Sequence, residues 1–273
     1  PCDENRRYGG NTSCVVLDVP GGEPILFDLG TGLRFYGVAE PCAGAPFRGT
    51  ALVSHLHWDH VQGLPFFAPL LCDGAHLDVF GPAEGGSSLE ASFEAFMNPP
   101  YFPICIRDLA GEIAFHDVDE CSFEVGPARV TARSVPHVGL TYGYRVDWNG
   151  TSVAYVSDHQ QPVDEPQRVA DSVLELADGV DLLIHDAQFT PEEFAERSDW
   201  GHCTVDYALE VAHQAAAREL VLFHHDPAHD DDTVDRLLAG AQERCSDLDV
   251  ADVSAAAEGR TISLHRSGHL STV

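Results

Sequence analysis

The sequence predicts an α/β fold in which two mixed β-sheets lie face to face with helices on their outer surfaces. Short β-rich segments bounded by Gly or Pro fill the first half of the chain, and helical segments alternate with strands in the second half. No repeat of about 20 to 50 residues and no low-complexity linker divides it. We therefore expect a single domain over 1–273, arranged as an αββα sandwich.

The expected strands are short apolar runs rich in β-branched or aromatic residues, at 13–19, 25–28, 50–54, 77–80, 129–135, 141–147, 152–157, 181–185 and 219–223. The expected helices each have Ser, Asp, Thr or Pro near their start, and they span 88–97, 166–177, 191–196, 204–218 and 231–244. The Pro-rich stretch 98–103 cannot form regular structure and is expected to be a loop.

The charge balance limits the ligands that the chain can bind. All 15 basic residues are arginine, and 44 acidic residues give a net charge of −29 at pH 7. Nucleic-acid binding by counterion release needs a basic face, so a large RNA or DNA ligand is disfavoured while small anionic substrates remain open.

Other features bear on compartment and redox state. No apolar run approaches the roughly 18 residues of a membrane span, and no segment has the pattern of a secretory signal. We expect a soluble, cytoplasmic protein without a membrane partner. The eight cysteines form no C-x-x-C pair and are expected to be reduced and mostly buried. The oligomeric state stays open, a homodimer included.

The strongest chemical signal is the segment 54–60, Ser-His-Leu-His-Trp-Asp-His, directly after an apolar strand. His55 and His57 project to the same side if the strand continues, while a turn at Trp58 would bring Asp59 and His60 towards a second point. Two adjacent metal ions are therefore indicated. The alternative is a polar loop in which the histidines have no ligand role.

This segment resembles the signature of the metallo-β-lactamase superfamily, whose members bind one or two metals between the sheets of an αββα sandwich. The segments 8–13 and 28–32 are similar to the opening strands and first glycine-rich turn of its phosphodiesterase branch, which includes ribonuclease Z and the phosphoribosyl cyclic phosphodiesterases. A further strand usually precedes the first motif in that branch. Met97 is the only methionine, so we expect this strand to be missing upstream of residue 1.

The resemblance implies a ligand set by position. His137 and Asp158 follow expected strands and match the third histidine and the metal-bridging aspartate, and His224 matches the final histidine, with His225 as the alternative ligand. The first metal would then have His55, His57, His137 and Asp158, and the second Asp59, His60, His224 and the shared Asp158. All these ligands are nitrogen or oxygen atoms, so zinc is the first choice of divalent ion and manganese or iron the alternatives. A hydroxide bridging the two metals would be the nucleophile, which makes Asp59 a catalytic as well as a ligating residue.

The resemblance also implies substrate contacts. The segment 200–204 is similar to the Gly-His-Ser-Thr element of ribonuclease Z, in which the histidine contacts the phosphate or protonates the leaving oxygen, so His202 is expected to act on the substrate. Asp186, in 185–189, stands where that branch has Glu and would orient His202. Tyr101 and Phe102 would cover the pocket and stack on a flat group of the substrate.

These features predict a dinuclear metal-dependent hydrolase. The leading interpretation is a phosphodiesterase that acts on a small anionic phosphodiester, such as a cyclic nucleotide or cyclic ribose phosphate. The alternatives are an RNA 3′-end nuclease like ribonuclease Z, a lactonase, thioesterase or β-lactamase acting on a carbonyl, and a metal-binding sensor without turnover. No Gly- or Lys-rich insertion that could form a basic arm for tRNA is visible.

Overall fold

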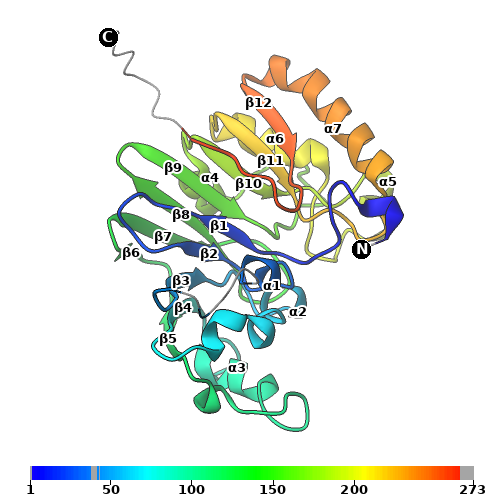
Figure 1. The fold of residues 1–273 in the computed structure, drawn as a ribbon. Helices are drawn as coiled ribbons and strands as arrows, with labels where there is room; N and C mark the ends of the chain where they lie inside the picture. Colours follow the sequence, from blue (N-terminus) through cyan, green and yellow to red (C-terminus); the bar gives the residue numbers. More distant parts are fainter. Residues whose placement is uncertain (1, 38–41, 43, 265–273) are drawn as a thin grey trace.

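The computed structural model describes residues 2–37, 42 and 44–264, which form two facing sheets (Figure 1). The first sheet has the order β1 to β5 and contains Val15–Leu17, Ile25–Phe27, Arg48–Leu52, His76–Pro82 and Glu112–Val118. Its β1 and β2 are antiparallel, and the other neighbours are parallel. This arrangement brings the C-terminal end of β3, after which 54–60 begins, to one edge of the sheet.

The second sheet runs in the order β12-β11-β10-β9-β8-β7-β6. Its strands β6 to β9 are antiparallel neighbours, and β9 to β12 are parallel. In chain order they span Ser122–Val125, Ala128–Ser134, Tyr142–Trp148, Thr151–Val156, Leu182–Asp186, Glu219–Phe223 and Asp252–Ala255. Because β9, β10 and β11 are parallel, the loops that follow them emerge at the same edge of this sheet.

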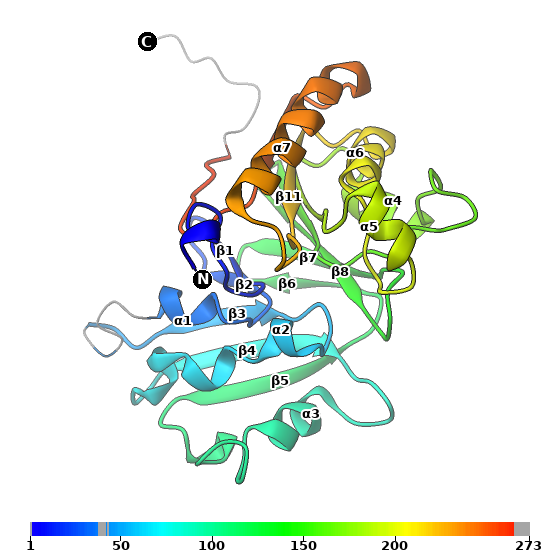
Figure 2. The same cartoon turned by 90° about the vertical axis from the view of Figure 1, so that its right-hand side faces the viewer.

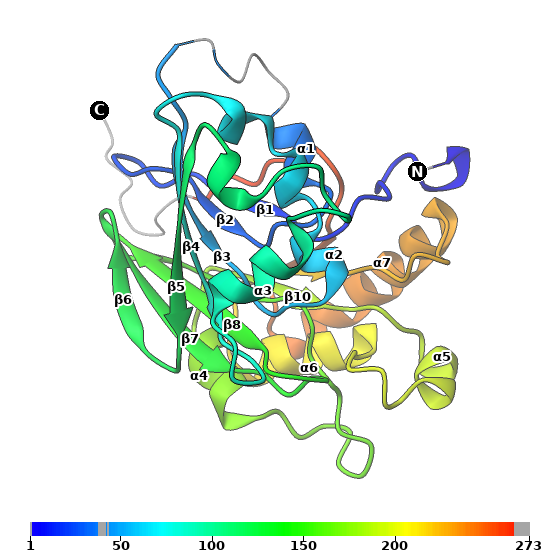
Figure 3. The same ribbon diagram turned by 90° about the horizontal axis from the view of Figure 1, so that it is seen from below.

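Helices cover the outer faces of both sheets. On the first sheet lie α1 (Leu33–Tyr36), α2 (Trp58–Val61) and α3 (Leu89–Phe96), which Figure 3 shows from below. With the second sheet lie α4 (Asp171–Ala177), α5 (Pro191–Glu196), α6 (Val205–Gln214) and α7 (Asp231–Cys245), and Figure 2 separates this group from α3 at the opposite side. Short 3-10 helices occur at Asp3–Asn5, Leu64–Phe66, Ala68–Leu71, Ile106–Asp108 and Ser246–Leu248.

Three apolar clusters match these layers: one under each helical layer and one between the two sheets. Between the sheets, the rings of Phe27 and Tyr155 stack with their centroids 4.9 Å apart. The buried hydroxyl of Tyr144, in the second sheet, donates a hydrogen bond to the carbonyl of Val53 in the first. The expected αββα sandwich is therefore confirmed.

The boundaries of several elements differ from the expectation for identifiable reasons. The strands β5, β6 and β12 were not expected, because β5 and β6 alternate apolar with charged or polar residues and β12 has only four residues. Helix α4 begins at Asp171 and not at residue 166, since Ala170 is still extended. Helix α6 ends at Gln214, before the expected residue 218, because Ala216 adopts a left-handed backbone with φ 50°.

The cysteines also depart from the expectation. Cys42 and Cys72 form a disulfide across 30 residues of sequence. Of the six free cysteines, Cys203 is buried, whereas the others are exposed or partly exposed. The expectation of reduced and mostly buried cysteines was wrong, because bridge formation depends on which loops the fold brings together and leaves no spacing signal in this sequence.

Among the described residues, no helix is both long enough and apolar enough to span a bilayer.

Candidate metal centre

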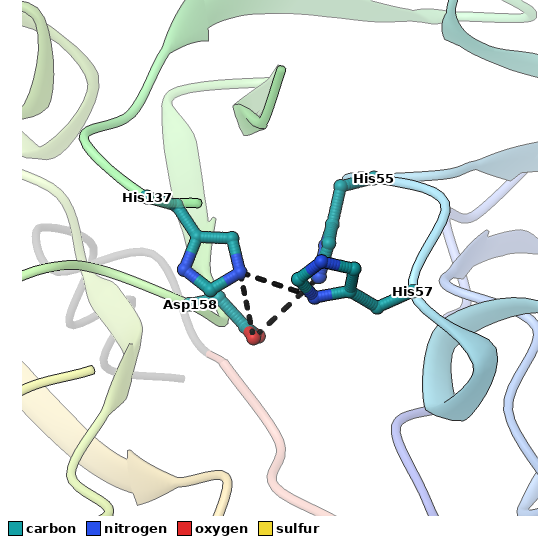
Figure 4. A group of neighbouring side chains, drawn as sticks. All are labelled: His55, His57, His137 and Asp158. Atoms are coloured by element: carbon teal, nitrogen blue, oxygen red, sulfur yellow. Dashed lines mark hydrogen bonds and ion pairs between the residues drawn. The ribbon is translucent and has the colours of Figure 1, made fainter. Parts of the chain in front are cut away.

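Four residues from both sheets meet where the strands end (Figure 4). His55 and His57 lie in the loop after β3, and His137 and Asp158 lie in the loops after β7 and β9. The Nε2 atoms of His55 and His137 are 3.6 and 3.7 Å from Oδ2 of Asp158. His57 Nδ1 is 3.3 Å from His137 Nε2. The three imidazoles and one carboxylate oxygen therefore surround one point, with spacing that suits a metal ion.

A second group lies on the other side of Asp158. His60 Nε2 and His224 Nε2 are 3.3 and 3.1 Å from Oδ2 of Asp59. The same two nitrogens are 3.3 and 3.7 Å from Oδ1 of Asp158. The two oxygens of Asp158 thus face different groups, Oδ2 the first and Oδ1 the second. A carboxylate in this position can be shared between two cations.

The chemistry of the cluster fits divalent ions. His55 Nε2, His60 Nε2 and Asp158 Oδ1 are buried polar atoms without a hydrogen-bond partner within the described part of the chain. Leaving three such atoms unsatisfied in the interior would be costly, and coordination to a cation satisfies all of them. Imidazole and carboxylate ligands suit zinc, manganese and iron alike.

Protonation in the cluster depends on burial and on the two carboxylates. Burial lowers the pKa of His55 to about 2, so its imidazole is neutral and its Nε2 lone pair is free to bind a cation. Burial also works to lower the pKa of His224, but Asp158 and Asp59 raise it to about 9. For Asp158 itself, burial opposes ionisation, yet the neighbouring His224 and His60 hold the pKa of the carboxyl below its usual value. The site therefore keeps its carboxylates charged and attracts positive charge.

The two adjacent histidines after β11 point in different directions. His224 has a left-handed backbone with φ 55°, and its Nε2 reaches Asp59. The Nε2 of His225 lies 3.2 Å from the carbonyl oxygen of Ala256, and its ring packs edge-on against Tyr8. The structure brings His224 into the cluster and leaves the alternative ligand His225 outside it.

Asp28 supports the cluster from beneath. Its buried Oδ2 accepts hydrogen bonds from His60 Nδ1, from the Ser54 hydroxyl and from the Tyr155 hydroxyl, at 2.8, 2.9 and 2.7 Å. Its Oδ1 accepts from the backbone N–H of Ser54 at 2.7 Å. The bond from Nδ1 fixes the tautomer of His60 that leaves Nε2 free for a metal. Asp28 lies in the glycine-rich turn singled out in the sequence, but its contact with His60 could not be predicted without the fold.

We expect Asp28→Asn to weaken both the fold and metal binding. If the amide nitrogen replaced Oδ2, three buried donors would lose their acceptor. If it replaced Oδ1, the N–H of Ser54 would lose its acceptor. We expect a loss of about 2 to 4 kcal/mol in the free energy of unfolding and a loss of about 10- to 100-fold in metal affinity. Denaturant unfolding and metal titration measure these changes. Tyr155→Phe removes one of the four hydrogen bonds and should cost about 1.5 kcal/mol; an equal cost for both variants would contradict this role of Asp28.

His202 lies against the cluster with its ring held by Asp186. His202 Nδ1 is 2.9 Å from Asp186 Oδ2 and 3.8 Å from Asp158 Oδ2. Its ring stacks on that of His224 with a centroid distance of 5.0 Å. Asp186 is buried and also accepts hydrogen bonds from the backbone N–H groups of His159 and Gln188. Asp186 engages Nδ1 of His202, and no hydrogen bond holds Nε2 among the residues that the structure describes, so Nε2 can act on a substrate or a metal.

A glutamine that the sequence did not single out connects the loops of His137 and His202. The backbone N–H of Gln160 donates to the carbonyl of Pro136, and its side-chain oxygen accepts from the N–H of Gly201, at 2.7 and 2.9 Å. The Gly201 carbonyl in turn accepts from His137 Nδ1 at 2.7 Å. Gly201 has φ +94°, and a Cβ there would lie 2.3 Å from His137 Nδ1. The approach of the two loops therefore requires glycine at this position.

Tyr101 and Phe102 are not brought to the cluster. The side chain of Tyr101 is 78% exposed, and the ring of Phe102 packs edge-on against Phe66 at 6.2 Å. No hydrogen bond or ring contact joins either residue to the metal-binding groups within the described residues. Their loop follows α3 and packs against the segment around Phe66, so a role in covering the pocket stays a prediction.

A separate group of Glu193, Asp226 and His229 also has ligand-like spacing. Arg197 already supplies a positive charge to this group, because its guanidinium forms an ion pair with Asp226 at 2.5 Å. His229 Nε2 is 2.9 Å from Glu193. These contacts give both carboxylates of the group a partner and fix the loop after β11 next to α5.

Comparisons with known proteins agree with this geometry. The family described as Beta-lactamase superfamily domain matches residues 25–225. Ribonuclease Z of Pyrococcus horikoshii is 26% identical over 268 residues, covering 80% of this chain and 82% of that protein.

Solved structures are similar over almost the whole fold. The metallo-beta-lactamase fold protein YhfI of Bacillus subtilis has a TM-score of 0.67 at 18% identity, with 93% of this chain and 94% of that one covered. Human tRNase Z, short form, has a TM-score of 0.66 at 22% identity, with 93% of each chain covered. With its family match spanning the strands and loops that carry the histidine and aspartate cluster, the chain belongs to the beta-lactamase superfamily and is a metal-dependent hydrolase of the metallo-β-lactamase fold.

Proposed function

We propose that the chain is a phosphodiesterase that uses two divalent metal ions, zinc first and manganese or iron as alternatives, on a small anionic substrate such as a cyclic nucleotide or cyclic ribose phosphate. The observation that carries this proposal is the position of Asp158, whose two oxygens face two separate groups of nitrogen and oxygen ligands. His55, His57 and His137 would hold one ion and Asp59, His60 and His224 the other. Bound ions there would polarise the phosphoryl oxygens and lower the pKa of coordinated water.

The protein's own groups supply orientation and proton transfer. Asp186 fixes the ring of His202 through Nδ1, which leaves the second nitrogen to contact the phosphate or to protonate the leaving oxygen. Asp59, bonded to His224 and 38% exposed, is positioned to orient a water molecule that enters the site. Asp28 holds the ring of His60, and Gln160 connects the loops that carry His137 and His202. These contacts position the imidazoles before a substrate binds.

The distribution of charge supports a small substrate. The net charge is −29, and nine arginines lie within ion-pair distance of an aspartate or glutamate: Arg6, Arg7, Arg48, Arg133, Arg145, Arg168, Arg197, Arg218 and Arg244. Arginines engaged by carboxylates contribute little to a phosphate-binding surface. A small phosphodiester experiences mainly the local field of the metal site.

The names of the relatives favour a second candidate. Ribonuclease Z is the name of the curated relatives from Pyrococcus horikoshii and from Anoxybacillus flavithermus, the latter matching 96% of this chain at 25% identity. These names run against our expectation that a nucleic-acid ligand is disfavoured, so an RNA 3′-end nuclease is the alternative function.

A panel of substrates tests the proposal. We expect the metal-loaded protein to hydrolyse bis(p-nitrophenyl) phosphate and a cyclic nucleotide, and to process a tRNA precursor, a lactone and a β-lactam poorly. We also expect weak tRNA binding at physiological salt, because few free basic groups are available to release counterions. The measurement is kcat/KM for each substrate together with tRNA affinity across a salt series. Tight, salt-sensitive tRNA binding with 3′-end cleavage would instead establish the nuclease.

A further inference from the structure

The metal centre opens to solvent next to two exposed tryptophans. In the first ligand group, His55 and Asp158 are buried, whereas His57 is exposed, so the cluster meets solvent at His57. Trp58 directly follows His57 in the chain, and its side chain is 61% exposed. Trp200 precedes Gly201 and is 60% exposed. Large aromatic side chains are usually well buried, so two with this exposure at one site call for an explanation.

The chain neighbours of the two tryptophans, His57 and Gly201, both contact His137. His57 Nδ1 and His137 Nε2 are 3.3 Å apart. The carbonyl of Gly201, the residue after Trp200, accepts a hydrogen bond from His137 Nδ1 at 2.7 Å. Trp58, the first residue of α2, directly follows His57, and Trp200, in the loop before α6, directly precedes the residue that bonds to His137. The exposed Val138 directly follows His137.

Each ring has one supporting neighbour. Trp58 packs on Phe96 of α3, with a centroid distance of 5.1 Å. The guanidinium of Arg197 lies 5.6 Å from the ring centroid of Trp200, and Asp226 holds that guanidinium in an ion pair. A flat ring that is held by one neighbour and is still largely exposed can accept a second flat group at little entropic cost.

We propose that Trp58 and Trp200 form a stacking subsite for a nucleobase, so that the substrate is a nucleoside-containing phosphodiester. This inference rests on the proposed phosphodiesterase function and adds its substrate class. In a nucleotide the base and the phosphate are separated by one ribose, which suits tryptophans that lie one and two residues along the chain from His57 and His202. Aromatic stacking accepts any base, because every base has a π-face.

A matched pair of substrates isolates the nucleoside. Thymidine 5′-(p-nitrophenyl) phosphate and methyl p-nitrophenyl phosphate share the leaving group and the phosphodiester, and the first alone carries a sugar and a base. We expect Trp58→Ala and Trp200→Ala each to lower the ratio of kcat/KM for these two substrates by about 5- to 150-fold. Phenylalanine at either position should preserve most of the ratio. Trp148→Phe is the control. Strand β8 approaches the metal-binding segment at Tyr142, whose N–H donates to the carbonyl of Ser54, and Trp148 lies at the opposite end of this strand.

The outcomes separate this inference from the function on which it rests. If the wild type hydrolyses both esters and neither alanine variant changes the ratio of kcat/KM, the base subsite is overturned. The phosphodiesterase function would still stand in that case. No hydrolysis of either ester by the metal-loaded wild type would refute the phosphodiesterase itself.

Tryptophan fluorescence gives a readout that does not require turnover. We expect thymidine 5′-monophosphate to quench the emission of the wild type and of Trp148→Phe, and ribose 5-phosphate to quench neither. The double variant Trp58→Phe/Trp200→Phe should lose the response. Equal quenching by the two phosphates, or quenching that persists in the double variant, would overturn the assignment.

Discussion

Replacing Asp158 by alanine is expected to remove at least one metal ion and to lower phosphodiester hydrolysis by about 10³-fold or more. The carboxylate is buried, and its two oxygens face the two ligand groups separately, so no neighbouring side chain can take over both contacts. A metal acting as a Lewis acid contributes several kcal/mol to stabilising the transition state, and each 1.4 kcal/mol corresponds to about tenfold in rate. The measurement is kcat/KM on bis(p-nitrophenyl) phosphate with excess metal.

Two controls separate loss of the site from loss of the fold. Asp164→Ala removes one carboxylate from an exposed loop that follows the same strand, and it should retain the wild-type rate. Circular dichroism and thermal unfolding should show that Asp158→Ala remains folded. A folded Asp158→Ala protein with the wild-type rate would refute the bridging role.

Replacing His202 by alanine is expected to slow hydrolysis by about 10² to 10⁴-fold while leaving the metal content unchanged. The ring is fixed by Asp186 and stacks on His224, yet its Nδ1 is already engaged, so one nitrogen remains for the leaving oxygen. The expected range is that of a lost general acid. Asp186→Asn should reproduce part of the loss, because the amide cannot orient the imidazole as the carboxylate does.

The leaving group distinguishes the possible roles of His202. p-Nitrophenolate needs little protonation, so the loss should be smaller on bis(p-nitrophenyl) phosphate than on a cyclic nucleotide, whose leaving alkoxide needs a proton. Equal losses on the two substrates would assign His202 to phosphate binding alone. A fall in metal content would make it a ligand, which the proximity of Asp158, His202 and His224 allows.

Much of the fold was predictable because it depends on local patterns. The strand Glu219–Phe223 and the helix Pro191–Glu196 have the expected boundaries, since an apolar run and a Thr-Pro start with a capping box define them within a few residues. The grouping of His55, His57, Asp59 and His60 was accessible for the same reason, as these residues share one short segment.

Contacts between distant segments were less accessible. The support of His60 by Asp28 and the connection made by Gln160 join loops far apart in the chain, and neither has a spacing signal. The choice between His224 and His225 depends on a single left-handed residue at the end of β11. The position of Tyr101 depends on how its loop packs after α3. Each of these features follows from tertiary packing, which periodicity and composition do not encode.

Elemental analysis of the purified native protein, side by side with Asp158→Ala, tests the central claim most directly. Two groups of ligands that share one carboxylate predict two divalent transition-metal ions per chain in the native protein and at most one in the variant. Native protein that contains no transition metal and takes up none on reconstitution would contradict the account.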